Sequence, residues 1–158
     1  MRIQLVICAV LLILFPACRE HDGSKIIYLA EEEGKQNLWM MNPDGSGKQP
    51  LTDLEFSVMW PDWSPDGEKI VFTSYDEGRT GLYIVDSDGT NLRKLDVEIQ
   101  NPDLPCWSHD SRHIAFMAER GDGIQIADVN GRIIRSVAGG EIGGAYQKCS
   151  PAGPQLVF

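Results

Sequence analysis

The chain has 158 residues and a formal net charge of −9, from 23 acidic and 14 basic side chains. Its hydrophobic content of 42% supplies enough core material to exclude a disordered chain. The acidic balance excludes nucleic acid as the main partner, because phosphate binding requires a surface rich in lysine and arginine. Sixteen glycines and nine prolines favour turn-dense β structure, and the length is that of one domain.

Residues 1–17 have the layout of a secretory signal peptide. Arg2 supplies the positive start, and residues 3–15 are apolar except for Gln4. This apolar run is shorter than the roughly 20 residues that cross a bilayer, so a retained transmembrane anchor is the least favoured interpretation. We therefore expect the chain to be exported.

The end of the leader points to a lipid anchor. Leu14-Phe15-Pro16-Ala17-Cys18 resembles a bacterial lipobox, which implies cleavage before Cys18 and lipidation of its thiol. Residues 18–24 are mostly polar after this cysteine and would form a short tether. We expect a membrane-anchored lipoprotein of the bacterial periplasm, with plain secretion as the alternative. The lipid at Cys18 would be the only contact with a membrane.

From residue 25 onward the chain repeats itself with a period of 42–44 residues, and two separate patterns recur in step. The first pattern is a turn that begins with serine, followed by a strand of β-branched and aromatic residues. The second is an apolar strand that ends in a turn with glycine. The copies of the first pattern are residues 63–72, 107–116 and 149–158, with 25–28 matching 69–72; those of the second are 38–45, 82–89 and 124–131.

Each repeat is predicted to form four short strands, which in the middle copy are residues 57–63, 69–75, 82–86 and 92–95. Asp-Gly between apolar runs is a strong hairpin signal, because glycine takes a positive φ at little steric cost. A repeat of roughly 40–45 residues with four antiparallel strands is a β-propeller blade. The sequence therefore predicts an all-β fold, an open or incomplete β-propeller of about three blades plus a partial one.

The predicted segments are a partial blade over 25–52, blades over 56–96 and 100–137, and a partial blade over 143–158. The two tryptophans of the first pattern are expected between neighbouring blades. The residues predicted to hold the repeat are Trp63, Asp66, Gly67, Asp88, Gly89, Trp107 and Asp110.

The repeat resembles that of the TolB β-propeller family. The resemblance is carried by residues 61–72 (Pro-Asp-Trp-Ser-Pro-Asp-Gly-Glu-Lys-Ile-Val-Phe), 84–95 and 41–52, and it extends over 25–158. It implies a scaffold of the bacterial cell envelope that binds a protein or a ligand. Related repeats occur in propellers of prolyl-oligopeptidase-type peptidases, tricorn-like proteases and envelope lipoproteins. The resemblance therefore identifies the type of repeat and not one particular protein.

No constellation of catalytic residues stands out, and we predict no catalytic residue, metal or cofactor. The sequence lacks a Gly-x-Ser-x-Gly nucleophile elbow. His109 and His113 are four residues apart but lie across a predicted β-turn, where they would not share a face as on a helix. The aspartates of the turns suggest calcium, but bonding to nearby backbone N–H groups is the favoured interpretation. These aspartates are Asp44, Asp66, Asp88 and Asp110.

One turn departs from the pattern, because Ser111 stands where its counterpart has Gly67. That turn must adapt or bear backbone strain.

The loops between the second and third strands differ from copy to copy, and binding residues often lie on such scaffold-held loops. Their acidic character would steer a basic partner, and a solvated face without a partner is the alternative. The candidate binding residues are Glu31, Glu32, Glu33, Asp76, Glu77, Arg79, Glu119, Arg120 and Asp122.

Two of the four cysteines belong to the leader region, Cys8 within it and Cys18 at its end. Cys106 and Cys149 remain, and export to an oxidising compartment would permit a bridge between them. Sequence does not show their separation, and free buried cysteine is common. Free thiols are the favoured expectation.

Three functions remain open at this point. The chain is a non-enzymatic binding scaffold, or the propeller part of a peptidase or polysaccharide-degrading enzyme whose catalytic part lies elsewhere. An adjoining reading frame for an α/β-hydrolase would support the second. In the third, the chain is a truncated propeller that works by self-association through unpaired blade edges, because a propeller typically needs at least about 4 blades to close.

Overall fold

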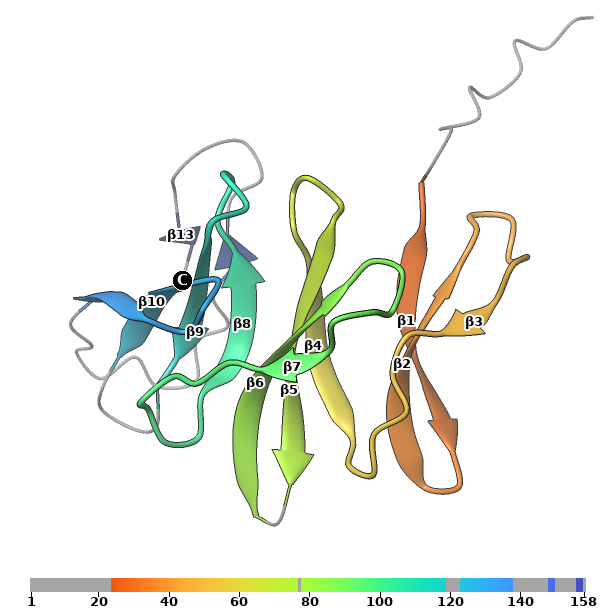
Figure 1. Ribbon diagram of the computed structural model, residues 1–158, viewed down its shortest axis with the longest axis horizontal. Helices are drawn as coiled ribbons and strands as arrows, with labels where there is room; N and C mark the ends of the chain where they lie inside the picture. The colour runs from red at the N-terminus through yellow and green to blue at the C-terminus, as the bar shows by residue number, and fades with distance from the viewer. Residues whose placement is uncertain (1–23, 77, 119–122, 138–147, 150–155, 158) are drawn as a thin grey trace, which may run out of the picture.

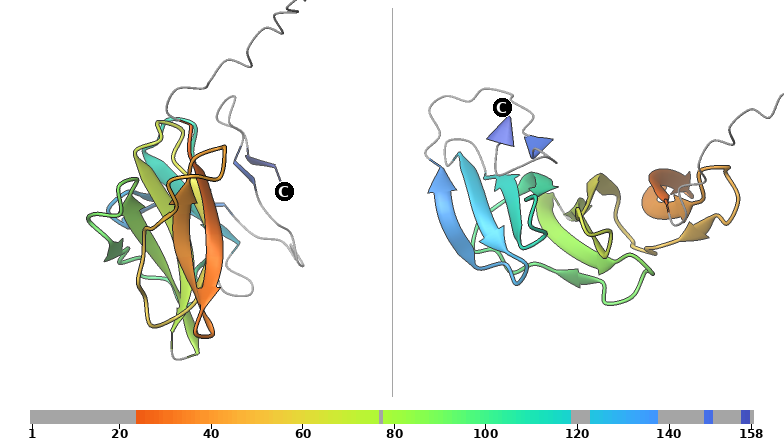
Figure 2. Two further views of the ribbon diagram at one scale, coloured as in Figure 1. Left: turned by 90° about the vertical axis from the view of Figure 1, so that its right-hand side faces the viewer. Right: turned by 90° about the horizontal axis from the view of Figure 1, so that it is seen from above.

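The computed structural model describes residues 24–76, 78–118, 123–137, 148–149 and 156–157. Within these residues every regular element is a β-strand, and the strands form four sheets that follow one another in an arc (Figures 1 and 2). The leader, its Cys18, and candidate residues Glu77, Glu119, Arg120 and Asp122 lie outside the described residues. The described part contains no helix that is long and apolar enough to cross a membrane.

The first sheet has three strands in the order β1-β2-β3, and the last has two. The two sheets between them have four strands each, in consecutive antiparallel order. The strands are β1 (Ile26–Glu32), β2 (Lys35–Met41), β3 (Gln49–Pro50), β4 (Val58–Trp63), β5 (Lys69–Asp76), β6 (Arg79–Asp86), β7 (Arg93–Lys94), β8 (Asp103–Trp107), β9 (His113–Met117), β10 (Ile124–Asp128), β11 (Ile133–Val137), β12 (Lys148–Cys149) and β13 (Leu156–Val157).

The predicted fold class is confirmed: the chain is all-β, with antiparallel blades in an open arc. One difference in the second blade concerns the hairpin of β5 and β6, where the third strand begins at Arg79 instead of residue 82. The ladder continues to the pair Asp76 and Arg79, because a two-residue loop lets the strands pair up to the tip. Gly78 in this loop has φ +86°.

The hydrophobic cores lie between the sheets. Trp63 packs against the cluster between the first and second sheets, and Trp107 belongs to the cluster between the second and third. Along β5, Ile70 and Phe72 belong to the cluster with the first sheet, whereas Val71 belongs to the cluster with the third. This alternation follows from the two-residue period of a strand, and both faces of the blade are therefore apolar.

The first strand of each four-stranded sheet, which we call the inner strand, carries a β-bulge. The register shifts between Met59 and Asp62 in β4, and between Asp103 and Cys106 in β8. Trp60 and Leu104 occupy equivalent places in the two bulges, and both have φ +52°, a region that bulky residues rarely adopt. After the bulge in β4, Asp62 faces the third sheet while Trp63 faces the first.

Candidate functional site

The turns at one end of the blades are held by aspartate and serine side chains. In the turn after β4, Ser64 Oγ donates to Asp66 Oδ1 at 2.6 Å and accepts from the backbone N–H of Lys69 at 2.9 Å. Asp66 Oδ1 also accepts from the backbone N–H of Glu68 at 3.0 Å. Each side chain thus satisfies backbone groups that the tight turn leaves unpaired.

The turn after β8 repeats this network. Ser108 Oγ donates to Asp110 Oδ1 at 2.5 Å and accepts from the backbone N–H of His113 at 3.0 Å, and Asp110 accepts from the N–H of Arg112. Ser111, at the place of the glycine, has φ +56° against +73° for Gly67. The turn therefore keeps its shape and bears backbone strain: the serine adopts the left-handed conformation that glycine occupies in the other copy.

The second kind of turn uses aspartate in a similar way. Asp44 Oδ1 accepts from the N–H and hydroxyl of Ser46 at 2.9 and 2.7 Å. Asp88 does the same with Thr90 at 2.9 and 2.6 Å. Gly89, the predicted repeat glycine, has φ +86° in this turn.

Hydrogen bonds lower the pKa of all four turn aspartates. The largest cause is the hydroxyl of Ser46 for Asp44, of Thr90 for Asp88 and of Ser108 for Asp110. At Asp66 burial raises the pKa, but the bonds from Ser64, Glu68 and Ser111 outweigh it. These carboxylates stay ionised and accept local hydrogen bonds. Among the residues that the structure describes, no group of three or more His, Cys, Asp or Glu could hold a metal ion.

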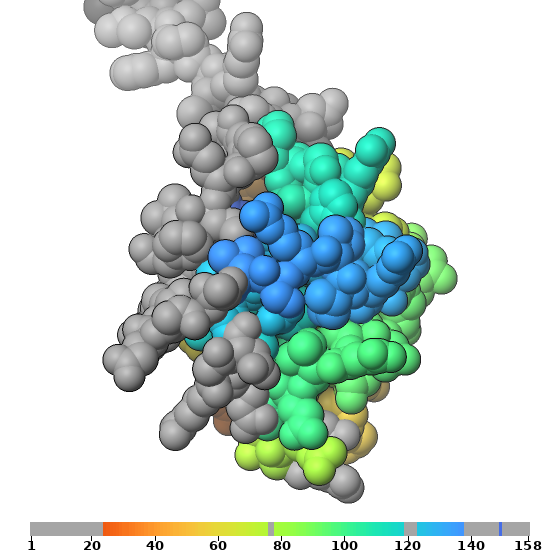
Figure 3. Space-filling view, turned by 90° about the vertical axis from the view of Figure 1, so that its left-hand side faces the viewer, coloured from red at the N-terminus to blue at the C-terminus, as the bar shows by residue number. Residues whose placement is uncertain are grey.

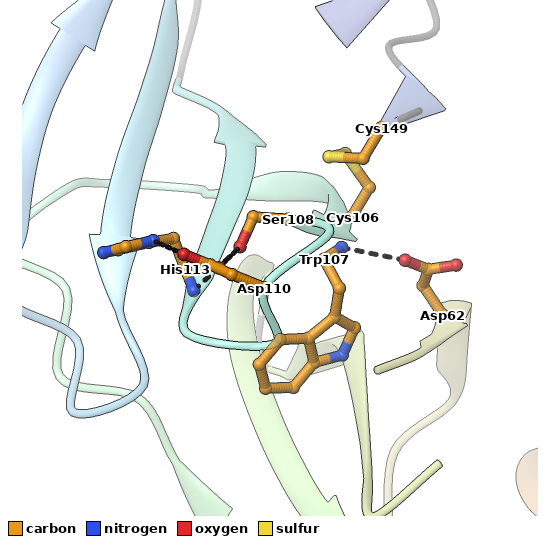
Figure 4. The surroundings of a disulfide bond; sticks show 7 residues. All are labelled: Asp62, Cys106, Trp107, Ser108, Asp110, His113 and Cys149. Atoms are coloured by element: carbon orange, nitrogen blue, oxygen red, sulfur yellow. Dashed lines mark hydrogen bonds and ion pairs between the residues drawn. A yellow bond between two sulfur atoms is a disulfide. The ribbon is translucent and has the colours of Figure 1, made fainter. Parts of the chain in front are cut away.

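One of these turns contains the residue types of a catalytic triad, but in an order that does not activate a nucleophile. His113 Nδ1 lies 3.3 Å from Asp110 Oδ2, and Ser108 Oγ donates to Oδ1 of the same carboxylate (Figure 4). In a working triad the imidazole takes the proton of the serine hydroxyl. Here the carboxylate stands between serine and histidine, so the group stabilises the turn.

Neighbouring blades are joined at one repeated position of the inner strand. Asp62 of β4 accepts a hydrogen bond at 2.8 Å from the backbone N–H of Trp107 in β8 (Figure 4). Cys106 occupies the equivalent place 44 residues later, and it forms a disulfide with Cys149 of β12, with 5.7 Å between the Cα atoms. The expectation of free thiols was wrong, because the blade arrangement brings β8 and β12 side by side.

A further contact joins the turns of neighbouring blades. The backbone N–H of Asp66 donates to Ser111 Oγ at 3.1 Å. Ser111 thus strains the backbone of its own turn but also forms a hydrogen bond to the neighbouring blade. Sequence analysis did not identify this bond or the role of Asp62, although the 44-residue register that aligns Asp62 with Cys106 was visible.

The opposite end of the blades carries the candidate binding loops. Figure 1 shows the β1–β2 and β5–β6 hairpin tips and the linkers that precede β4 and β8 at this common end. Glu31, Glu32 and Glu33 are exposed, and Glu33 and Gly34 form the tip with φ +53° and +79°. Arg79 is exposed at the next tip.

Further carboxylates surround the first tip. Lys35 forms an ion pair with Glu55 of the linker that leads to β4. The hydrogen bond to Glu55 raises the pKa of Lys35, and the charges of Glu55, Glu33 and Asp53 raise it further. The structure thus brings one predicted loop together with linker acids that sequence analysis had not assigned. We call Glu31, Glu32, Glu33, Asp53 and Glu55 the acidic loop end.

The fold and these junctions define a class, the β-propellers of four-stranded antiparallel blades. Within that class, a family model described as the TolB beta propeller domain matches residues 2–158. The chain belongs to this family. No curated protein sequence matches it.

Solved structures agree with this assignment. A protein described as TolB from Agrobacterium tumefaciens is 25% identical, with a TM-score of 0.73 over 87% of this chain and 50% of that one. TolB from Acinetobacter baumannii is 22% identical, with a TM-score of 0.58 over 71% of this chain and 29% of that one. An oligogalacturonate lyase in complex with manganese shares the fold at 18% identity, a TM-score of 0.63, and coverage of 87% and 42%. The chain thus spans half or less of these proteins.

Proposed function

We propose that this chain is a non-enzymatic binding scaffold of the bacterial cell envelope, and that the acidic loop end contacts a basic protein or ligand. The observation that carries the proposal is the group of exposed carboxylates around the β1–β2 tip. Three carboxylates of this group, Glu55, Glu33 and Asp53, raise the pKa of Lys35, so a cationic side chain of a partner would meet the same favourable potential there.

The Lys35–Glu55 pair would not block such a partner. The Glu55 side chain is 83% exposed, and exposed ion pairs contribute little because solvent screens them. A partner's lysine or arginine can therefore replace Lys35 at Glu55 at little cost. Because solvent-exposed charges are screened by salt, the association should weaken as ionic strength rises.

The test is a pull-down from envelope extract with the triple variant Glu31→Gln, Glu32→Gln and Glu33→Gln. We expect the variant to lose partners that the natural chain retains at low salt and releases at high salt. The matched control is Glu68→Gln, which removes an exposed carboxylate at the opposite end of the blades. Unchanged partners in the triple variant would contradict the role given to the acidic loop end.

We also propose that the chain works in the periplasm and is held at a membrane by a lipid on Cys18. The support is the leader of residues 1–17 and the lipobox-like sequence that follows it. Cells fed a labelled fatty acid should label the natural chain and not Cys18→Ser, which should appear in the soluble periplasmic fraction. Equal labelling of both would refute the anchor.

The rival proposal is a propeller part of a peptidase or polysaccharide-degrading enzyme. It draws on structural neighbours that include an oligogalacturonate lyase and the propeller of the trilobed protease from Pyrococcus furiosus, at 18% and 16% identity. Likeness at this level concerns the fold alone. An adjoining reading frame that encodes a hydrolase, together with co-purification of that hydrolase with the chain, would favour this rival over the scaffold.

A further inference from the structure

The outer edges of the second and third sheets carry basic side chains. β7 is the last strand of the second sheet and β11 the last of the third, so each has one edge without a neighbouring strand in the described part of the chain. Residues 89–95 and 129–137, which include these strands, contain no acidic side chain, although the whole chain has a net charge of −9. Their four basic side chains are all exposed: Arg93, Lys94, Arg132 and Arg135.

The two edges adjoin and form one surface. Arg93 Nη2 donates a hydrogen bond at 2.7 Å to the backbone carbonyl of Val129, which lies 36 residues further along the chain. Gly131 lies so close to Asp96 that a Cβ atom on the glycine would meet the Asp96 backbone at 3.0 Å. Figure 3 shows the blue surface of β10 and β11 beside the green surface of the segment that includes β7.

Exposed aliphatic side chains lie among these cations. Leu92 is 36% exposed and Ile134 is 53% exposed, and both belong to the same two edge segments. Charged residues on an edge strand also prevent pairing with another sheet, but that role requires no exposed aliphatic side chain. A surface that lies on a bilayer combines cations with apolar side chains. We define the basic rim as Leu92, Arg93, Lys94, Arg132, Ile134 and Arg135.

Carboxylates flank the basic rim at its ends. Three of them belong to turns and accept local hydrogen bonds there: Asp86, Asp88 and Asp128. Asp86 also forms an ion pair with Lys69 at 2.5 Å. Asp96 and Glu98 are exposed in the linker that follows β7. The edge strands themselves therefore present cations, and the acids lie before and after them.

We propose that the basic rim is the surface with which this chain lies on a bilayer that contains anionic lipids. The inference rests on the proposed lipid anchor at Cys18, which would hold the chain within reach of such a surface. Anionic headgroups attract clustered lysine and arginine, and they repel the acidic remainder of the chain, so the basic rim determines which side faces the membrane. It shares no residue with the acidic loop end, so the bilayer and a basic partner would contact different side chains.

The test is flotation of the full chain with Cys18→Ser, in which no acyl chain contributes, on vesicles of phosphatidylcholine with or without an equal amount of phosphatidylglycerol. The chain should float with the mixed vesicles at low salt and dissociate as the salt concentration rises. Replacement of the four basic residues of the rim by glutamine should weaken this partitioning at least about tenfold, because each cation near an anionic surface contributes roughly fivefold.

The matched control removes four exposed cations outside the basic rim: Lys25→Gln, Lys48→Gln, Arg79→Gln and Arg112→Gln. It reaches the same net charge and should retain most of the binding. Leu92→Gln combined with Ile134→Gln should weaken binding to the mixed vesicles without a change in charge, because it removes the apolar contact with the bilayer.

A charge-retaining variant separates lost binding from lost folding. Replacement of the three arginines of the basic rim by lysine should preserve flotation, and its loss in a variant with natural circular dichroism would overturn the proposal. Equal flotation with both kinds of vesicle, unchanged flotation of the glutamine variant, or an equal loss in the matched control would overturn it as well. If the glutamine variant instead lost an acidic protein from an envelope pull-down while its vesicle binding was unchanged, the rim would belong to a protein partner. Fatty-acid labelling of the natural chain tests the anchor separately, so the two failures are distinguishable.

Discussion

The junction between the second and third sheets and the junction between the third and fourth use the same place in the repeat for different chemistry. At the first junction Asp62 accepts a hydrogen bond from the backbone of Trp107, whose indole is buried in a large apolar cluster. At the second, Cys106 stands in place of the aspartate and Cys149 in place of the tryptophan. A covalent bond thus occurs where the repeat has lost its large aromatic side chain.

Blade stacking therefore depends first on position in the repeat and only secondarily on residue type. The bulge in each inner strand turns the residue before the tryptophan position toward the next blade. That residue can then contribute a carboxylate or a thiol. Either one fixes the inner strand of the following blade, and the apolar faces complete the contact.

The largest effect is expected at the core of the first of these junctions. Trp107 is 2% exposed, so Trp107→Ala should destabilise the chain by about 3–5 kcal/mol, through lost burial and a cavity. Urea unfolding followed by circular dichroism measures this. The matched variant Trp63→Ala at a partly buried tryptophan should cost less. Equal losses would contradict the description of Trp107 as the better buried anchor.

The disulfide should contribute nearly as much to the second junction. It closes a loop with a sequence separation of 43, for which chain entropy predicts about 4 kcal/mol of stabilisation. Replacing Cys106 and Cys149 together by serine should lower the urea midpoint accordingly, and reductant should have the same effect on the natural chain and none on the variant. A natural chain that is insensitive to reductant would contradict this.

Removal of the Asp62 carboxylate should have an intermediate effect. Hydrogen bonds to charged groups contribute about 1.5–3 kcal/mol, so Asp62→Ala should destabilise the chain by that amount. Asp62→Asn keeps an acceptor for the Trp107 N–H and should recover part of the loss. If asparagine and alanine were equivalent in thermal unfolding, the hydrogen bond would not be the cause.

A smaller effect is expected at Ser111, where strain and a hydrogen bond oppose one another. Ser111→Ala keeps the left-handed backbone and loses the bond from the Asp66 N–H, so it should cost about 1 kcal/mol. Ser111→Gly loses the same bond but relieves the strain of a non-glycine residue in the left-handed region, which costs about 1–3 kcal/mol. Glycine should therefore be the milder substitution, and an alanine variant as stable as the glycine variant would show that the backbone is unstrained.

The smallest effect concerns pH. The folded pKa of Asp88 is below the value of 3.8 for a free side chain, mainly because the Thr90 hydroxyl donates to it. Its contribution to stability is therefore present above pH 3.8 and is lost as pH falls through the lower, folded value. Asp88→Asn should flatten the acid side of the stability profile. A profile unchanged below pH 3.8 would contradict the role of this hydrogen bond.

Much of the fold could be predicted from the sequence because its signals are local. Asp-Gly turns and two-residue alternation mark the hairpins, and the 42–44-residue register places Trp63 and Trp107 between blades. The bulges at Trp60 and Leu104 could not be predicted, because neither residue favours a positive φ. The contact of Cys106 with Cys149 depends on the separation of two blades in space, which local patterns do not contain.

The candidate site was predictable only in part, for the same reason. Glu31, Glu32 and Glu33 form a visible run in one loop. Asp53 and Glu55 belong to a linker that the fold brings beside that loop, and the pKa of Lys35 reflects both. The acidic loop end is therefore a product of the blade-to-blade connection as much as of the hairpin.

Thiol mapping of the native chain tests the shared junction position most directly. The folded, oxidised chain would be alkylated, digested and analysed by mass spectrometry without reduction. We expect a linked peptide pair that joins Cys106 to Cys149, and no alkylation of either thiol before reductant is added. Alkylation of Cys106 and Cys149 in the folded chain before reduction would contradict the disulfide and the shared junction position.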